Sequence, residues 1–221
     1  MVSDLFAYRL YYDSTPDVAQ SLKKHNGNIV AMDWRTKTPG IAERHRYDYT
    51  YDGLNQLTEA QKMRWIPSCS GPVAPCHEWT NYYDWYSQSY SHEGWSASYS
   101  YDLNGNIKTL NRAGTTHYND DQLSYTYHGN QIQSIADNAS STYKANGFVD
   151  GANAAQEYYY DANGNMHKDL NKGIEHIRYN RMNLPEVIVF SSGHEIHYLY
   201  DAAGTKLSKT TYPAGGGETI T

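Results

Sequence analysis

Long apolar stretches, positive charge and phenylalanine are all scarce in this sequence of 221 residues. No stretch approaches the roughly 20 apolar residues that a membrane-spanning helix needs. The formal net charge is −6 and no basic stripe is present, so we expect no nucleic-acid partner. Residues 1–15 contain no apolar signal core, because Asp4, Arg9 and Asp13 interrupt them.

Cysteine is scarce as well. The two cysteines, Cys69 and Cys76, lie in a proline-rich loop at residues 67–76. In an oxidising compartment they could form a disulfide, which would stabilise the chain by about 2.5 kcal/mol in the loop-entropy model. Free thiols are the alternative. A metal site is conceivable because His77 follows Cys76, but a fourth ligand is not visible.

Tyrosine takes the place of the missing apolar residues. The chain has 23 tyrosines and 3 phenylalanines, and its hydrophobic share of 39% is low for a helical globular protein. A tyrosine ring buries a large apolar area while its hydroxyl stays in water or forms a hydrogen bond. This composition suits thin, half-exposed sheets.

The tyrosines recur in a motif, Tyr-Asp-x-x-Gly-x-(aliphatic), whose clearest copy spans residues 160–166. The first copy is split by an insertion between Asp13 and Asn26. Self-similarity of this kind predicts a repeat architecture, in which each unit buries its apolar side by stacking on neighbours. The seven copies, some of them degenerate, begin at Tyr12, Tyr51, Tyr101, Tyr127, Tyr160, Tyr179 and Tyr200.

Each copy predicts a β-hairpin. Residues before the Tyr-Asp pair alternate with period two and are rich in Tyr and Thr, which is typical of strands. Asn-Gly then provides the positive φ that tight hairpin turns need, and the Asp can bond to a backbone N–H two residues on. A calcium loop is the alternative, but the copies lack a distal bidentate carboxylate. The predicted turn residues are Tyr101, Asp102, Gly105, Tyr160, Asp161, Gly164, Tyr200, Asp201 and Gly204.

The uneven spacing of the motif predicts three insertions, at residues 14–25, 61–96 and 136–156. We predict an all-β fold of tandem antiparallel hairpins in a curved, open sheet over residues 1–213, with a flexible tail at 214–221. Very little helix is expected, apart from one possible helical turn within residues 55–65.

No pattern of catalytic residues is present. The segment His194-Glu195-Ile196-His197 lacks the spacing of a zinc-protease helix, and its strand context points the two histidines to opposite faces. Residues 191–193 form a turn rather than a nucleophile elbow. We therefore predict no catalytic residue, no metal ligand and no cofactor. A hydrolase or protease that uses the His and Asp residues is the third hypothesis, and it requires an activity of the intact chain that is lost when one His is replaced.

The insertion at residues 61–96 is the candidate for a binding function. Trp79, Trp85 and Trp95 lie within it, and planar aromatic rings can stack on sugars or anchor a protein partner. The alternative is that these rings pack on the sheet or cover an open edge. The sequence leaves both alternatives open.

Three consecutive motif copies, at residues 160–166, 179–185 and 198–207, resemble YD-repeat (Rhs) proteins, in the style of those from Bacteroidetes. The resemblance covers nearly the whole chain. It implies a segment of a longer, secreted or cell-surface protein, in which arrays of hairpins coil into a hollow β-shell. That shell encloses a C-terminal toxin, and related repeats occur on extracellular adhesive proteins.

The resemblance also implies partners: neighbouring repeats, or the toxin cargo of the parent protein. Nothing after Tyr212 matches the shell-closing core of the family, so its self-cleavage is carried over to no residue. The chain begins within a predicted strand, which suggests a piece of a longer protein. Open sheet edges recruit other strands, so we expect pairing with a second copy or capping by the insertions.

Overall fold

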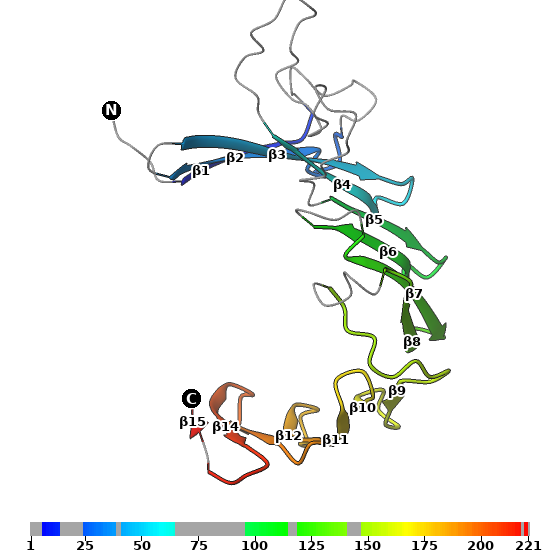
Figure 1. Ribbon diagram of the computed structural model, residues 1–221, viewed down its shortest axis with the longest axis vertical. Coiled ribbons are helices and arrows are strands. Elements are labelled where there is room, and N and C mark those ends of the chain that lie inside the picture. The colour runs from blue at the N-terminus through cyan, green and yellow to red at the C-terminus, as the bar shows by residue number, and fades with distance from the viewer. Residues whose placement is uncertain are drawn as a thin grey trace, which may run out of the picture. The chain divides into compact units, whose positions relative to one another are not determined.

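The computed structural model of the chain describes residues 6–13, 24–38, 41–64, 96–114, 119–140, 147–217 and 219–220. In these ranges the chain forms strands and turns, and no helix (Figure 1). The prediction of an all-β fold is confirmed. The prediction of a possible helical turn within residues 55–65 is wrong, because residues 57–64 form a strand that pairs along its length with the strand at residues 41–51.

The first sheet contains eight strands, and each lies beside the next one in the sequence. The strands from β1 to β6 pair antiparallel, each with its successor. No described strand closes this order into a barrel, so the sheet is open. The strands are β1 (Phe6–Tyr11), β2 (Ala31–Thr38), β3 (Ile41–Tyr51), β4 (Leu57–Arg64), β5 (Ser96–Tyr101), β6 (Ile107–Ala113), β7 (Asp121–His128) and β8 (Gln131–Asp137).

The second sheet contains seven strands in sequence order, and all of its pairs are antiparallel. It is also open. The strands are β9 (Tyr158–Tyr160), β10 (Met166–Asp169), β11 (Ile174–Tyr179), β12 (Pro185–Phe190), β13 (Glu195–Tyr200), β14 (Lys206–Tyr212) and β15 (Thr219–Ile220).

The chain divides into two compact units. The first comprises Met1–Leu123 and Asn138–Gly147, and the second comprises Ser124–Asp137 and Phe148–Thr221. Strand pairing extends into ranges that the sequence predicted as insertions or tail. Strand β4 continues to Arg64, β8 continues to Asp137, and β15 pairs with β14.

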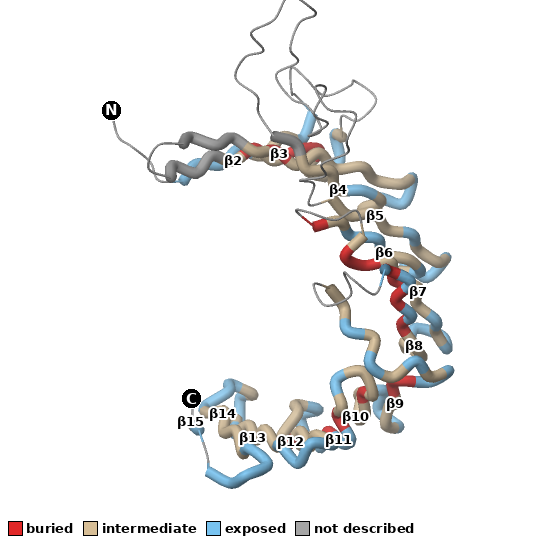
Figure 2. The backbone as a smooth tube through the Cα atoms, in the orientation of Figure 1, coloured by how far each residue is buried: buried red, intermediate tan, exposed pale blue. Residues whose placement is uncertain are grey.

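Burial is limited to short segments of the strands and to a few residues that flank them, such as Val30, Ala139 and Glu157 (Figure 2). In the second unit Ile174, Ile177 and Val187 are among the few buried apolar side chains. Ile174 and Ile177 are three positions apart, so a regular strand would point them to opposite faces. A register shift between Ile174 and His176 reverses the alternation, and both isoleucines become buried. The sheet therefore keeps a thin apolar core through a bulge.

No helix among the described residues is long and apolar enough to cross a membrane.

Candidate functional site

The Asp of each clear motif copy organises its turn through the side chain. Asp102 Oδ1 accepts hydrogen bonds from the N–H groups of Asn104 and Asn106, at 2.8 and 2.9 Å. Asn106 Nδ2 also donates to Asp102 Oδ2 at 2.9 Å. The two backbone contacts recur at Asp161 and Asp201. The degenerate copies repeat them at Asp52 and Asn180.

These hydrogen bonds favour the ionised carboxylate. The side-chain bond from Asn106 is the largest cause that lowers the pKa of Asp102, and the backbone bond from Thr205 has this role for the pKa of Asp201. Because the pKa is lower in the folded state, each carboxylate contributes to the stability of the fold at pH values above the pKa of the unfolded state. This contribution is lost as the pH falls through the pKa of the folded state.

The turn differs from the tight Asn-Gly turn that the sequence suggested. Gly105 and Gly164 have φ of 85° and 83°, whereas Asn104 and Asn163 do not have positive φ. Gly105 is the fourth residue of the turn that begins at Asp102, and a left-handed residue at this position forms a bulge. The register shifts between Ser100 and Tyr101 accordingly. The side-chain contacts of the Asp, two and four residues along the chain, fix this longer turn.

The tyrosine of several motif copies reaches the preceding hairpin. Tyr101 donates its hydroxyl hydrogen bond to the Leu57 carbonyl at 2.7 Å, and Leu57 lies two residues after Asn55, the left-handed residue of the preceding copy. We call this contact the tyrosine link. Three further tyrosine links also end two residues after the left-handed residue of the preceding copy. They join Tyr51 to the Ile29 carbonyl at 2.8 Å, Tyr179 to the Met166 carbonyl at 2.6 Å and Tyr200 to the Pro185 carbonyl at 3.1 Å.

Neighbouring turns are also joined by their side chains. Asn183 occupies the left-handed position of its turn, and its Oδ1 accepts from Asn165 Nδ2 at 3.2 Å and from Asn163 Nδ2 at 3.4 Å. Asn26 and Asn55 make a similar contact in the first unit. Within each unit, amide side chains and tyrosine links therefore join neighbouring turns to one another.

Removing one tyrosine link should lower stability. We expect Tyr179→Phe to cost about 1 kcal/mol, because the Met166 carbonyl loses its hydroxyl donor. Tyr198→Phe is the matched control, since the Tyr198 ring contacts Tyr200 and Lys206 but its hydroxyl forms no hydrogen bond among the described residues. Urea unfolding of both variants measures the effect. Equal losses would contradict a specific role for the link.

Burial raises the pKa of several tyrosines above the ordinary value of 10.0, and it raises that of Tyr158 to about 12. The folded state favours the neutral hydroxyl, and this stabilises the fold fully at pH values below the pKa of the unfolded state. The stabilisation is lost as the pH rises through the pKa of the folded state. We therefore expect cooperative alkaline unfolding above about pH 10. The other tyrosines with raised pKa include Tyr51, Tyr101, Tyr160, Tyr179 and Tyr200.

The measurement is a pH titration that follows tyrosinate absorbance and circular dichroism together. Both signals should change in the same range, because ionisation and loss of the strands are coupled. If all tyrosines ionised near pH 10 while the strands persisted, the hydroxyls would not be held as described.

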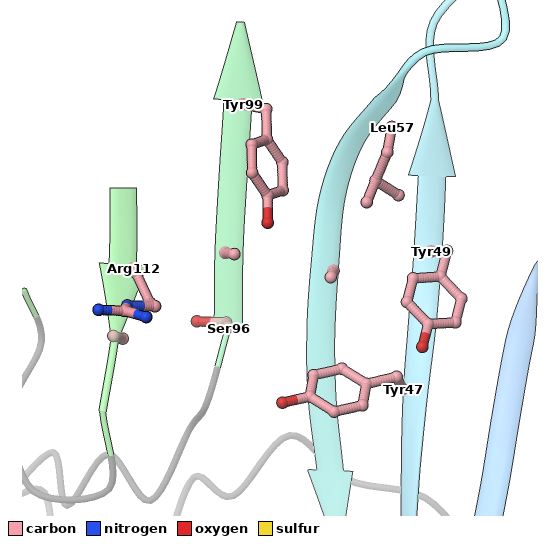
Figure 3. Close-up of a pocket in the computed structure, with 9 residues that line it drawn as sticks. Tyr47, Tyr49, Leu57, Ser96, Tyr99 and Arg112 are labelled. Atoms are coloured by element: carbon pink, nitrogen blue, oxygen red, sulfur yellow. The ribbon is translucent and has the colours of Figure 1, made fainter. Parts of the chain in front are cut away.

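An aromatic hollow of about 320 Å³ lies on one face of the first unit (Figure 3). Tyr47 and Tyr49 of β3 and Tyr99 of β5 line it together with the small side chains Ala60 and Ala97. Ala60 and Ala97 are partners in the register of β4 and β5, so the lining is low where these strands meet. The arrangement leaves a concave surface between tyrosine rings.

The aromatic surface continues from the hollow onto β2. Trp34 stacks on Tyr47 with ring centroids 5.5 Å apart, and Tyr47 stacks on Tyr49 at 6.0 Å. Arg112 of β6 lines the hollow and forms an ion pair of 2.6 Å with Asp121. Stacked, half-buried rings and a nearby guanidinium suit a ligand with a flat apolar face, such as one side of a sugar ring or an aromatic side chain.

The sequence does not single out this hollow. The alternation of His45, Tyr47 and Tyr49 is visible in the sequence, but that pattern predicts only a strand. The small residues at positions 60 and 97 become significant only through strand register.

A buried carboxylate organises the segment before β9 in the second unit. Glu157 is only 1% exposed. Its Oε2 accepts from the Ile135 N–H at 3.0 Å and from Asn171 Nδ2 at 2.8 Å, and its Oε1 accepts from the Ala154 N–H at 3.2 Å. The Glu157 N–H in turn donates to the Gln133 carbonyl at 2.6 Å. Glu157 therefore joins β8 to the chain that enters β9.

The histidines singled out in the sequence make local contacts. His197 Nε2 lies 2.7 Å from Glu195 Oε2, and His194 Nδ1 lies 2.7 Å from Ser192 Oγ. Over the described ranges, no group of three or more His, Cys, Asp or Glu side chains could hold a metal ion. The predicted ligand-binding residues Trp79, Trp85 and Trp95 and the predicted disulfide of Cys69 and Cys76 lie outside the described residues.

No protein-family model matches the chain, and no curated protein matches it. Among solved structures, it is similar to the Tc holotoxin pore of Photorhabdus luminescens, with a TM-score of 0.38 and 10% identity over 96% of this chain and 8% of that chain. It is also similar to TcdB2-TccC3, with a TM-score of 0.36 and 7% identity over 96% of this chain and 10% of that chain.

A third similar structure is TcdB2-TccC3 without its hypervariable C-terminal region, with a TM-score of 0.34 and 8% identity over 94% of this chain and 9% of that chain. The chain thus spans about a tenth of the length of these proteins. The chain's own strand order defines its fold as open, antiparallel sheets of consecutive hairpins.

Proposed function

We propose that the chain is a non-catalytic wall segment of a YD-repeat (Rhs-type) protein. In this proposal its hairpins form part of a shell around a C-terminal toxin, or part of a secreted or cell-surface protein. The observation that carries the proposal is the tyrosine link, which joins successive motif copies in the same way in both units.

A wall is the role that this construction supports. The tyrosine link ends on a backbone carbonyl, so it needs no particular side chain on the preceding hairpin and can be repeated along an array. The Asp-centred turns close each hairpin with backbone contacts of their own. Successive hairpins thus add to one another as units of a repeat protein, with neighbouring repeats as their first partners.

The test uses the complete gene product with any C-terminal domain that follows the repeats. Protease digestion should leave that domain intact within the assembled protein and degrade it when it is expressed alone. Equal digestion in both settings would contradict enclosure. Labelling of the intact protein on the surface of producing cells would then favour the role in a cell-surface protein.

The second candidate is a glycan- or protein-binding module that uses the aromatic insertion at residues 61–96. The aromatic hollow favours a binding role for this sheet, because Tyr47, Tyr49 and Tyr99 present rings around a concave surface. Glycan arrays and pull-down assays test it. Binding that survives replacement of Trp79, Trp85 and Trp95 by alanine would refute the role of the insertion. If binding is lost only in the Tyr47→Ala variant, the hollow is the binding site.

A further inference from the structure

Asn-Gly pairs are reactive sequences, and the described residues contain three, beginning at Asn26, Asn104 and Asn163. A fourth, at residues 146–147, begins outside the described residues. In such a pair the glycine backbone nitrogen can attack the asparagine Cγ and expel ammonia, which leaves a cyclic imide. Water then opens the imide to aspartate or isoaspartate. Glycine favours this reaction because it has no side chain to obstruct the attack.

Two of the pairs hold the attacking nitrogen in a hydrogen bond. The Gly105 N–H donates to the Asp102 carbonyl at 3.1 Å, and the Gly164 N–H donates to the Asp161 carbonyl at 3.0 Å. To attack, the nitrogen must lose its proton and turn away from this carbonyl, so the hydrogen bond must break first. The same Asp side chains also fix the turn around each asparagine.

The pair at Asn26 lacks this protection. In the intact copies the acceptor is the motif Asp, three residues before the glycine, but the insertion separates Asp13 from Gly27 and places Lys24 there instead. The Gly27 N–H forms no hydrogen bond within the described part of the chain. Both Asn26 and Gly27 are exposed.

The side chain of Asn26 is also folded toward the reacting nitrogen. Its Oδ1 accepts a hydrogen bond from the Asn28 N–H at 3.1 Å, which carries the carboxamide forward across Gly27. A hydrogen bond to this oxygen polarises the carbonyl and makes Cγ a better electrophile. The position of the Asn26 carboxamide and the polarisation of its carbonyl therefore both favour attack by the Gly27 nitrogen.

We propose that Asn26 is a site of spontaneous deamidation, and that Asn104 and Asn163 are protected in the folded chain. The modification has a structural consequence. Asn26 Nδ2 donates to Asn55 Oδ1 at 2.5 Å, which joins the first turn to the second. The product carboxylate has no hydrogen to donate and places a negative charge against this oxygen, so the contact is lost.

The test compares the three pairs within one sample. The full chain is incubated folded at mildly alkaline pH, and peptide mapping by mass spectrometry gives the deamidation rate at each asparagine. We expect Asn26 to react at least about tenfold faster than Asn104 and Asn163, the factor that one broken hydrogen bond represents. In urea, which unfolds all three turns, the rates should become similar.

Folded-state rates that are similar at all three positions would overturn the proposal, as would a rate at Asn26 that rises strongly on unfolding. Two variants test the consequence. Asn26→Gln keeps an amide and should stop the modification, whereas Asn26→Asp mimics one product. Hydrogen exchange at the Val30 N–H, which donates to the Tyr11 carbonyl at 2.8 Å, should accelerate in Asn26→Asp and in aged wild-type protein. Unchanged exchange would contradict the structural consequence.

Discussion

Replacing Glu157 by alanine should destabilise the second unit by roughly 3 to 5 kcal/mol, because it leaves three donors without their acceptor. These donors are the N–H groups of Ile135 and Ala154 and the Nδ2 group of Asn171. Glu157 is 1% exposed, so water does not readily replace the lost oxygens.

The loss should extend to the loop on the other side of Asn171. Asn171 Oδ1 accepts from the N–H groups of Gly151 and Ala152, at 2.9 and 3.0 Å. Its Nδ2 also lies 3.3 Å from the Tyr158 hydroxyl. Without Glu157, the orientation of this amide is less well determined, so we expect faster hydrogen exchange at Gly151 and Ala152 as well as at Ile135.

The control is Glu175→Ala, because Glu175 is an exposed carboxylate of the same unit with no hydrogen bond among the described residues. Its loss should change stability by less than about 0.5 kcal/mol. Urea unfolding monitored by circular dichroism gives both values. A Glu157→Ala variant as stable as this control would show that Glu157 does not join β8 to β9.

Gly147→Ala should cost the first unit about 2 to 3 kcal/mol through overpacking. A Cβ atom at this position would lie 2.0 Å from Asp121 Oδ1 and 2.7 Å from the Asp120 carbonyl oxygen. The Asp121 side chain cannot easily move, because it is buried and paired with Arg112 at 2.6 Å. The backbone carbonyl is still less able to give way.

Gly53→Ala is the matched control for this variant. A Cβ atom added to Gly53 would meet no atom within 4 Å, and its φ is not in the left-handed region. It should therefore be neutral or slightly stabilising. Thermal unfolding of both variants checks the difference, with a lower melting temperature expected only for Gly147→Ala. Equal melting temperatures would mean that Asp121 can move without cost.

The motif alone predicted the hairpins, because period-two alternation followed by Asp and Gly has one simple structural solution. It did not predict the kind of turn. Both residues of an Asn-Gly pair accept positive φ, and the contacts of Asp102 with the N–H groups of Asn104 and Asn106 decide that only Gly105 adopts it.

Glu157 shows what local patterns miss. It lies next to the range predicted as an insertion, and its partners Ile135 and Asn171 are distant in sequence. Only the folded chain brings this carboxylate to the outer edge of β8, which is the last strand of its sheet among the described strands. The aromatic hollow was missed for a similar reason, because register decides that Ala60 lies beside Ala97.

The sequence by itself determined the all-β class, the hairpin repeats and the residues at their turns, because these depend on contacts between residues a few positions apart. The tertiary structure decided which carbonyl each motif tyrosine reaches, which carboxylate becomes buried and where tyrosine rings surround a hollow. Those features depend on the register between strands, and a shift of one residue would turn every side chain to the other face.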